Sequence, residues 1–248
     1  MSWYAEAGVS VAVKEDVEMD IVLIGGLWLT ADVWESVVEE LGKRGHRGIA
    51  VPLPGQGDDD ATATLEDQLK AVTSAVTSVD RPLVVGHSAA ASLAWMAADR
   101  VADQVTGVVF VGGFPEADGA TYADFFEPED GWMRFPGWEK FEGPDSADLS
   151  AQQKRVTEQR MVGVPQGVSR ATVSLDHEER FGLPVTVICP EFSPQDARDA
   201  IEGGDAPELA AAQRVELTDL DSGHWPMVSC PDRFAEVLSE VASTLQDA

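Results

Sequence analysis

Short runs rich in Val and Ile recur along the chain, separated by stretches in which apolar residues have helical spacing. These runs lack the apolar–polar alternation of a strand with one face in water, so each is expected to be buried on both faces. The pattern predicts an α/β fold with a mostly parallel, doubly wound sheet. The expected strands lie within 19–26, 46–57, 81–88, 104–115, 183–190 and 213–225. The expected helices cover 30–45, 64–76, 90–101 and 231–245.

One segment interrupts this alternation of strands and helices. Residues 114–182 separate the expected strand near 105–112 from the one near 183–189. The segment is too long for a plain connection, so we expect an inserted lid on a core made of residues 1–113 and 183–248. Some of its aromatic side chains should attach the lid to the core, and others should line an apolar pocket. These aromatic residues are Phe125, Phe126, Trp132, Phe135, Trp138 and Phe141.

A serine follows the third expected strand at the point where an apolar strand becomes an apolar helix. The stretch reads VVGHSAA, and its serine is Ser88. The small residues Gly86, Ala89 and Ala90 permit a sharp turn that brings strand and helix close together. Functional groups of parallel sheets collect beyond the carboxyl ends of the strands. We therefore interpret Ser88 as a candidate nucleophile and the Ala89 N–H as an oxyanion donor. The alternative is an ordinary buried serine in a strand-to-helix turn.

A serine nucleophile needs a base, and the chain has four histidines. His46 lies in a turn before a strand and is expected to be structural, whereas His177 lies in a charged stretch of the insertion. His87 adjoins the nucleophile and is expected to pack beneath its turn. His224 lies between the last strand and the last helix, at the same end of the sheet as Ser88. We therefore predict that His224 is the general base.

These motifs together resemble the α/β-hydrolase family. The stretches GHSAA at 86–90 and SGHWPM at 222–227 resemble its nucleophile turn and its histidine loop. Residues 21–57 resemble its first strand, oxyanion loop and first helix. Residues 98–119 resemble the stretch before the cap in small capped esterases and in the hydroxynitrile lyase/methylesterase-like group. The resemblance implies a serine hydrolase and a second oxyanion amide on Leu27, with Trp28 as the less favoured choice.

The chain departs from the family pattern at three places. The nucleophile turn ends in Ala90 where Gly is usual, and the oxyanion loop opens with Gly25-Gly26 where His-Gly is usual. Neither change removes a required donor. The third departure concerns the catalytic acid, because the two positions that carry it in relatives fall here on Ser193 and Gly112.

Other carboxylates are candidates for this acid. Glu191 is the first choice, because its long side chain could reach His224 from a position two residues before Ser193. Glu116 and Asp118, at the start of the insertion, are the alternative acids. A Ser–His dyad without an acid is the remaining possibility.

Composition restricts the partners and the location of the chain. Its 44 acidic and 17 basic residues give a net charge of −27, which repels nucleic acid and anionic membranes. The acidic surface is expected to serve solubility, with adaptation to high salt as the alternative. Cys189 and Cys230 make no disulfide framework and no metal-ligand spacing is visible, so we expect no metal and no cofactor. Residues 1–20 show no signal peptide and no apolar run reaches a span of ~20 residues, which predicts a cytoplasmic protein.

The function that this sequence predicts is cleavage of a small or medium apolar carboxylic ester through an acyl-enzyme on Ser88. One alternative keeps the fold but has lactonase, C–C hydrolase or hydroxynitrile lyase-type chemistry. The other is a non-catalytic ligand-binding module on a hydrolase scaffold, which the two empty acid positions suggest. The residues expected to bind the substrate are Trp28, His87, Phe125, Phe126, Trp132, Trp138 and Trp225.

Overall fold

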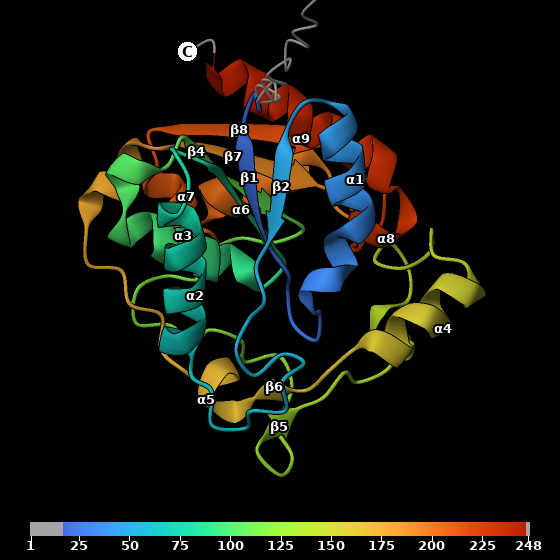
Figure 1. Cartoon of the computed structure of the whole chain (residues 1–248). Helices are drawn as coiled ribbons and strands as arrows, with labels where there is room; N and C mark the ends of the chain where they lie inside the picture. The colour runs from blue at the N-terminus through green and yellow to red at the C-terminus, as the bar shows by residue number, and fades with distance from the viewer. Residues whose placement is uncertain (1–16, 247–248) are drawn as a thin grey trace, which may run out of the picture.

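Six parallel strands form the central sheet of the molecule (Figure 1). The computed structural model describes residues 17–246. The sequence predicts no signal peptide in residues 1–20, and most of that stretch, residues 1–16, lies outside the described residues. The strand order is β2-β1-β3-β4-β7-β8, and every neighbouring pair is parallel. The strands are β1 (Asp20–Ile24), β2 (Arg47–Ala50), β3 (Leu83–His87), β4 (Gly107–Val111), β7 (Pro184–Cys189) and β8 (Arg214–Asp219). All six lie within the stretches predicted from the sequence.

The central strands are buried on both faces, which explains their composition. In β1, Ile21 and Leu23 pack with α1 (Glu35–Lys43) and α9 (Pro231–Gln246) on one face. Val22 and Ile24 belong to the cluster on the other face, built from α2 (Leu65–Thr77) and α3 (Ala90–Arg100). Each face of the sheet thus has its own apolar core, and the predicted doubly wound α/β architecture is confirmed.

Shorter elements complete the core. Between β7 and β8, the structure contains two helices that the sequence interpretation did not include, α6 (Pro194–Gly203) and α7 (Pro207–Ala211). Both pack on the same face as α2 and α3. The remaining short elements are η1 (Ala31–Trp34), η2 (Ala102–Gln104) and α8 (Pro226–Ser229).

Residues 114–182 run between β4 and β7, and most of them lie beyond the carboxyl ends of the strands (Figure 1). The last part returns beside α3 to the amino end of β7. We call them the insertion. It contains a two-stranded antiparallel ladder, β5 (Trp132–Met133) with β6 (Val164–Pro165), and one peripheral helix, α4 (Ala151–Arg160). Its short helices are η3 (Trp138–Phe141), α5 (Gln166–Ser169) and η4 (Glu178–Gly182).

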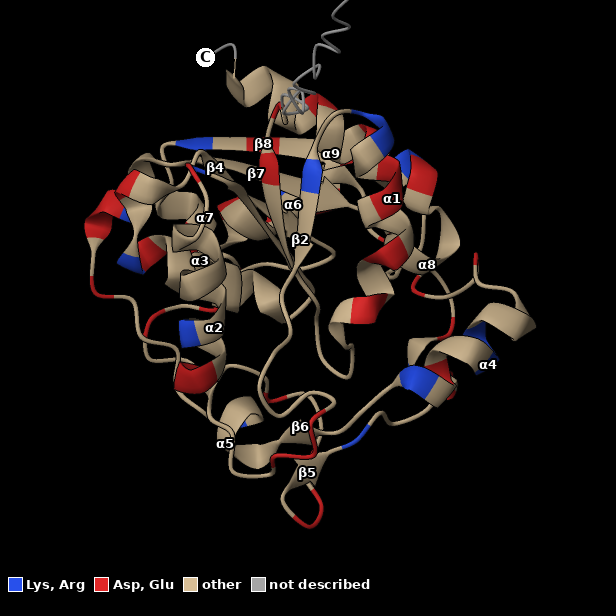
Figure 2. Ribbon diagram, in the orientation of Figure 1, with Lys and Arg blue, Asp and Glu red and all other residues tan. Residues whose placement is uncertain are grey.

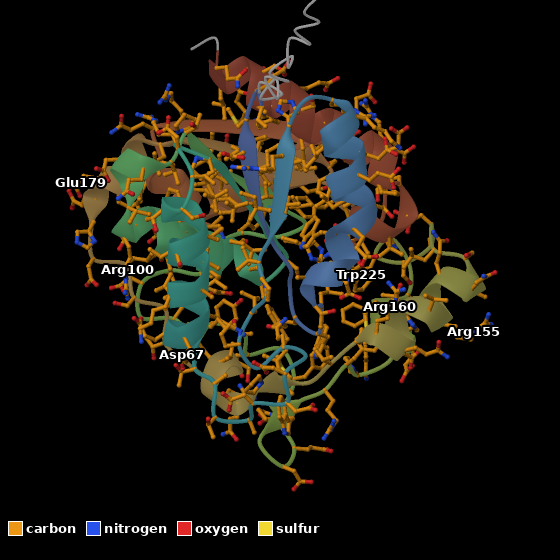
Figure 3. All side chains as sticks on the ribbon, in the orientation of Figure 1. Asp67, Arg100, Arg155, Arg160, Glu179 and Trp225 are labelled. Atoms are coloured by element: carbon orange, nitrogen blue, oxygen red, sulfur yellow. The ribbon has the colours of Figure 1, made fainter. Side chains whose placement is uncertain are left out.

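Charge is distributed unevenly over these elements. Acidic residues occur on both layers of helices and on the loops, whereas basic residues are few and several lie on α4 (Figure 2). Arg155 on this helix lies at the periphery of the molecule, whereas Arg160 lies at the end of the helix that faces the core, 3.8 Å from Asp32 (Figure 3). Among the described residues, no helix is both long and apolar enough to cross a membrane.

Candidate active site

Ser88 lies on a strained turn between β3 and α3. Its φ angle is +56°, a left-handed conformation that non-glycine residues rarely adopt. The turn is tight. A Cβ on Gly86 would lie 2.4 Å from the Ala90 carbonyl oxygen, and a Cβ on Gly113 would lie 2.9 Å from the Ser88 carbonyl oxygen. The Ser88 N–H donates to the Val111 carbonyl oxygen of β4 at 2.8 Å, which anchors the turn to the sheet. Small neighbours are therefore a steric requirement of this turn.

Three side chains form a continuous hydrogen-bonded chain at this end of the sheet. His224 Nε2 lies 2.9 Å from Ser88 Oγ, and His224 Nδ1 lies 2.5 Å from Glu191 Oε1. A carboxylate only accepts, so Nδ1 donates to Glu191 and Nε2 accepts the Ser88 hydroxyl proton. The side chains of His224 and Glu191 are 16% and 13% exposed, so bulk water screens the pair weakly. This arrangement can remove a proton from Ser88 and stabilise the imidazolium that forms.

The position of Glu191 explains why Gly112 occupies one of the usual acid positions. Gly112 directly follows β4 and has φ +62°. A Cβ on Gly112 would lie 3.1 Å from His224 Nδ1 and 3.2 Å from Glu191 Oε2. The Glu191 carboxylate therefore occupies the space that a side chain at residue 112 would fill. The Glu191 Oε2 atom is buried and has no hydrogen-bond partner within residues 17–246.

The other acid candidates have different contacts. Ser193, the second usual position, is the N-cap of α6, and its Oγ accepts from the Asp196 N–H at 3.2 Å. Asp118 accepts from the Leu175 N–H at 3.0 Å and so ties two parts of the insertion together. Glu116 lines the cleft, but no hydrogen bond joins its carboxylate to His224 in the described structure. Of the three carboxylates, only Glu191 contacts the imidazole.

Two backbone amides at the site are free to donate. Within residues 17–246, neither the Leu27 N–H nor the Ala89 N–H has a hydrogen-bond acceptor, and both residues line the cleft. The loop that carries Leu27 lies against the nucleophile turn, because a Cβ on Gly26 would lie 3.0 Å from Ser88 Cβ. The buried Gln56 braces this loop by donating from Nε2 to the carbonyl oxygens of Gly26 at 3.2 Å and Leu29 at 2.8 Å.

His87 supports the site from below and does not face the cleft, so its predicted role in substrate binding is wrong. It is 1% exposed, and its Nε2 donates to the His224 carbonyl oxygen at 2.7 Å. Burial, together with the nearby His224, lowers the pKa of His87 to about 3 and keeps its imidazole neutral. The side chain of the last β3 residue therefore holds the backbone of the histidine loop.

The insertion holds the same loop from the other side. The His224 N–H donates to the Asp145 carbonyl oxygen at 2.8 Å, and the Gly223 N–H donates to Asp148 Oδ2, also at 2.8 Å. A Cβ on Gly223 would lie 2.4 Å from the Asp145 carbonyl oxygen, so this contact needs glycine. Burial raises the pKa of the Asp145 carboxyl. The insertion is thus part of the frame that positions His224.

A cleft of about 690 Å³ opens above Ser88 and His224. Besides Ser88, His224 and Glu116, five of the site residues predicted from the sequence line it: Leu27, Trp28, Ala89, Phe125 and Phe126. Phe125 is 57% exposed, so an apolar side chain stands at a position that water reaches. Phe141, one of the insertion aromatics that were expected to attach the lid or line a pocket, also lines the cleft. The lining residues without a sequence prediction are Ser92, Phe114, Tyr122, Asp124 and Asp205.

Three predicted substrate-binding tryptophans lie outside this cleft. Trp225 is 2% exposed, with its ring 5.1 Å from that of Trp138 and 5.2 Å from that of Phe141 (Figure 3). Trp138 donates from Nε1 to the Lys154 carbonyl oxygen at 3.2 Å. Trp132 packs on Gly163, where a Cβ would lie 2.9 Å from its ring. All three pack the insertion on itself or on the core and do not contact the cleft.

Among residues 17–246, the cysteines and the possible metal ligands form no second centre. Cys189 and Cys230 are both free thiols, and burial raises the pKa of Cys189 to about 12. Within the described part of the chain, no group of three or more His, Cys, Asp or Glu side chains could hold a metal ion.

A model of the alpha/beta hydrolase family matches residues 21–237 of the chain. Among curated proteins, none matches the chain significantly.

Solved structures of similar fold include several enzymes. An extracellular alpha/beta-hydrolase from a Paenibacillus species, described as homologous to tobacco salicylic acid binding protein 2, is 20% identical with a TM-score of 0.74. The match covers 90% of this chain and 98% of that one. A methylesterase from Arabidopsis is 15% identical with a TM-score of 0.73, covering 91% and 99% of the two chains. A pyrethroid hydrolase from Sphingobium faniae is 18% identical with a TM-score of 0.67, covering 93% and 99%. At these identities the likeness concerns the fold.

Proposed function

The chain belongs to the alpha/beta hydrolase family, and from that premise we propose that it is a serine hydrolase of small or medium apolar carboxylic esters. The observation that carries the proposal is the hydrogen-bonded chain Ser88–His224–Glu191 at the floor of an aromatic cleft. A hydroxyl, an imidazole and a carboxylate in this order are what nucleophilic acyl transfer requires.

The proposed reaction has two halves. His224 Nε2 takes the Ser88 proton while Ser88 Oγ attacks the acyl carbon, and the N–H groups of Leu27 and Ala89 hold the oxyanion. The imidazolium, stabilised by Glu191, returns the proton to the departing alcohol, which leaves an acyl group on Ser88. His224 then deprotonates a water molecule, which attacks the acyl carbon, and the acid departs as Ser88 recovers its proton.

We further propose that the insertion acts as the lid of this site. Trp28, Phe126 and Phe141 pack at ring-centroid distances of 5.8 to 6.2 Å and form one apolar wall of the cleft. Such a wall would hold the apolar part of an ester and keep water from the acyl-enzyme. The non-catalytic alternative loses its motivation, because a carboxylate does contact His224.

Hydrolysis of p-nitrophenyl butyrate tests this function, together with acid quenching and mass spectrometry to detect a butyryl group on Ser88. We expect turnover and an adduct in the wild type and neither in Ser88→Ala. Ser92→Ala is a matched control, because Ser92 lines the same cleft without contacting His224. The proposal fails if Ser88→Ala retains the wild-type rate. Activity on a lactone, a vinylogous diketone or a cyanohydrin in the absence of ester cleavage would support the alternative chemistry.

A further inference from the structure

The cleft is lined by carboxylates and aromatic rings and, among the described residues, by no lysine or arginine. Its acidic lining residues are Glu116, Asp124 and Asp205. Asp124 forms an ion pair with Arg170, which lies outside the cleft lining and also pairs with Glu127 at 3.0 Å. Within residues 17–246, the carboxylates of Glu116 and Asp205 have neither a hydrogen-bond partner nor an ion-pair partner. The cleft therefore carries uncompensated negative charge.

The backbone of Glu116 is hydrogen-bonded to α3, the helix that follows the nucleophile turn. The Glu116 N–H donates to Ser92 Oγ at 2.9 Å. Ser92 lies on α3, about one helical turn after Ser88. Gly113, which comes shortly before Glu116 in the chain, packs directly on the Ser88 backbone. Glu116 is half-buried, and burial raises the pKa of its carboxyl, because the ionised form loses solvent without gaining a partner. A cation bound in the cleft would compensate this loss.

The aromatic lining suits the same kind of ligand. Besides the wall of Trp28, Phe126 and Phe141, the cleft contains Phe114, Tyr122 and the exposed Phe125. The faces of such rings attract alkylammonium groups while still accepting their apolar substituents. An anionic ligand would meet repulsion from Glu116 and Asp205 and find no basic side chain in the lining. The net charge of −27 adds a general attraction for cations at low salt.

We propose that Glu116 determines specificity and that the cleft prefers esters whose apolar body carries a positive charge, such as alkylammonium esters. This inference rests on the proposed serine hydrolase function, and it adds the charge of the substrate to it. In the bound state the ammonium group lies beside Glu116, among the aromatic rings, while the acyl carbon lies at Ser88.

A pair of esters that differ only in charge tests the inference. Butyrylcholine ends in a trimethylammonium group, and 3,3-dimethylbutyl butyrate ends in a tert-butyl group of nearly the same shape. At low ionic strength we expect the wild type to favour the cationic ester in kcat/KM by about tenfold or more. In Glu116→Gln this preference should fall about fivefold to tenfold. High salt should reduce the preference in the wild type.

Glu129→Gln is the matched control, because it also removes one acidic charge, from an exposed residue of the insertion that lies outside the cleft and has no ion-pair partner among the described residues. This variant should keep the wild-type preference. Equal or lower kcat/KM for the cationic ester, or equal loss of preference in both variants, would overturn the inference.

A binding measurement separates this inference from the proposed function. Calorimetric titration of Ser88→Ala with the two intact esters requires no turnover. Tighter binding of butyrylcholine, weakened in the double variant Ser88→Ala/Glu116→Gln, supports the charge preference even if the wild type hydrolyses neither ester. Binding of the neutral ester that is equally tight or tighter contradicts it.

Discussion

Glu191 is the residue on which the chemical account most depends. It approaches His224 from beyond β7, and its carboxylate fills the space above Gly112. The sequence predicts Glu191 as the acid because its side chain is long enough to reach His224. In the structure, Glu191 Oε1 lies 2.5 Å from His224 Nδ1. Sequence alone could not explain why residue 112 is glycine. The explanation is steric, because the Glu191 carboxylate beyond β7 fills the space that a side chain beyond the neighbouring strand β4 would need.

Replacing the acid by its amide tests this role. Glu191→Gln preserves size but removes the negative charge that stabilises the imidazolium, so turnover should fall at least about a hundredfold with little change in stability. Steady-state kinetics and urea unfolding measure the two effects. If Asp118→Asn lowers turnover to that degree and Glu191→Gln does not, the assignment of the acid is wrong.

Gly112→Ala tests the steric part of the same account. The new methyl group would lie 3.1 Å from His224 Nδ1 and 3.2 Å from Glu191 Oε2, and should separate the two groups. Gly119→Ala is a matched control, because Gly119 also has a positive φ, +80°, but has open space around its Cβ position. Both variants should lose about 1–2 kcal/mol of stability from backbone strain. Only Gly112→Ala should also lose most of its kcat, and similar kcat values for the two would contradict the proposed steric role.

His87 predicts a pH dependence of stability. Its pKa is about 3 in the folded chain against an ordinary histidine value of 6.5, so at intermediate pH the unfolded chain binds a proton that the folded chain does not. The free energy of unfolding should therefore fall as the pH drops below about 6.5, by up to ~1.4 kcal/mol per pH unit from this group. Urea unfolding at pH 6.5 and pH 5 measures the slope.

In His87→Asn, whose amide can still donate to the His224 carbonyl oxygen, this slope should decrease. It should not vanish, because burial also lowers the pKa of His46. An unchanged slope in His87→Asn would show that His87 is not the source.

At the scale of elements, strands were easier to predict than the connections between them. Each main strand is a local run of buried apolar residues, so its sequence is sufficient. Helix α6 was missed although its signals are present, with Ser193 as N-cap, Pro194 in the first turn, Asp196 completing a capping box and Gly204 at the end. In the family pattern the same stretch holds an acid position, so sequence alone does not separate that role of residue 193 from a helix cap.

The insertion was predicted as a segment but not in its internal structure. Its aromatic residues have no helical or strand period, so sequence could not distinguish those lining the cleft from those packing elsewhere. Phe125 and Phe126 line it, whereas Trp132 and Trp138 do not. Tyr122 gave no signal, but Phe114, which comes directly after Gly113 beyond the end of β4, could have been assigned to the cleft from its position.

A buried ion cluster fixes the end of the insertion to the core. Arg180 of η4 donates to Asp99 of α3 at 3.0 Å and to Glu208 of α7 at 2.8 Å. Arg180→Met leaves two buried carboxylates without their cation and should lower the free energy of unfolding by about 3–5 kcal/mol. Arg100→Met, which removes an exposed pair with Glu66, should cost at most about 1 kcal/mol (Figure 3). Equal effects in urea unfolding would refute the role of the cluster.

At the scale of the whole molecule, the insertion connects both halves of the site. Trp28, next to the oxyanion amide of Leu27, donates from Nε1 to the Met133 carbonyl oxygen at 3.1 Å. The histidine loop is held by Asp145 and Asp148. Displacement of the whole insertion would break these contacts, so a lid movement compatible with catalysis must be confined to parts such as the loop around Phe125.

Net charge gives a prediction for the molecule as a whole. With a net charge of −27, repulsion between carboxylates opposes folding, and salt screens it. The urea midpoint should therefore rise between low salt and ~1 M NaCl, where the screening length is only about 3 Å. Stability that does not change over this range would rule out adaptation to high salt.

The central claim is that Ser88 is an activated nucleophile. The most direct measurement is the intact mass of the protein after incubation with a fluorophosphonate, for the wild type, Ser88→Ala and Ser92→Ala. The account predicts rapid addition of one label to the wild type and to Ser92→Ala, and none to Ser88→Ala. An unlabelled wild type, or a label that persists in Ser88→Ala, would contradict it.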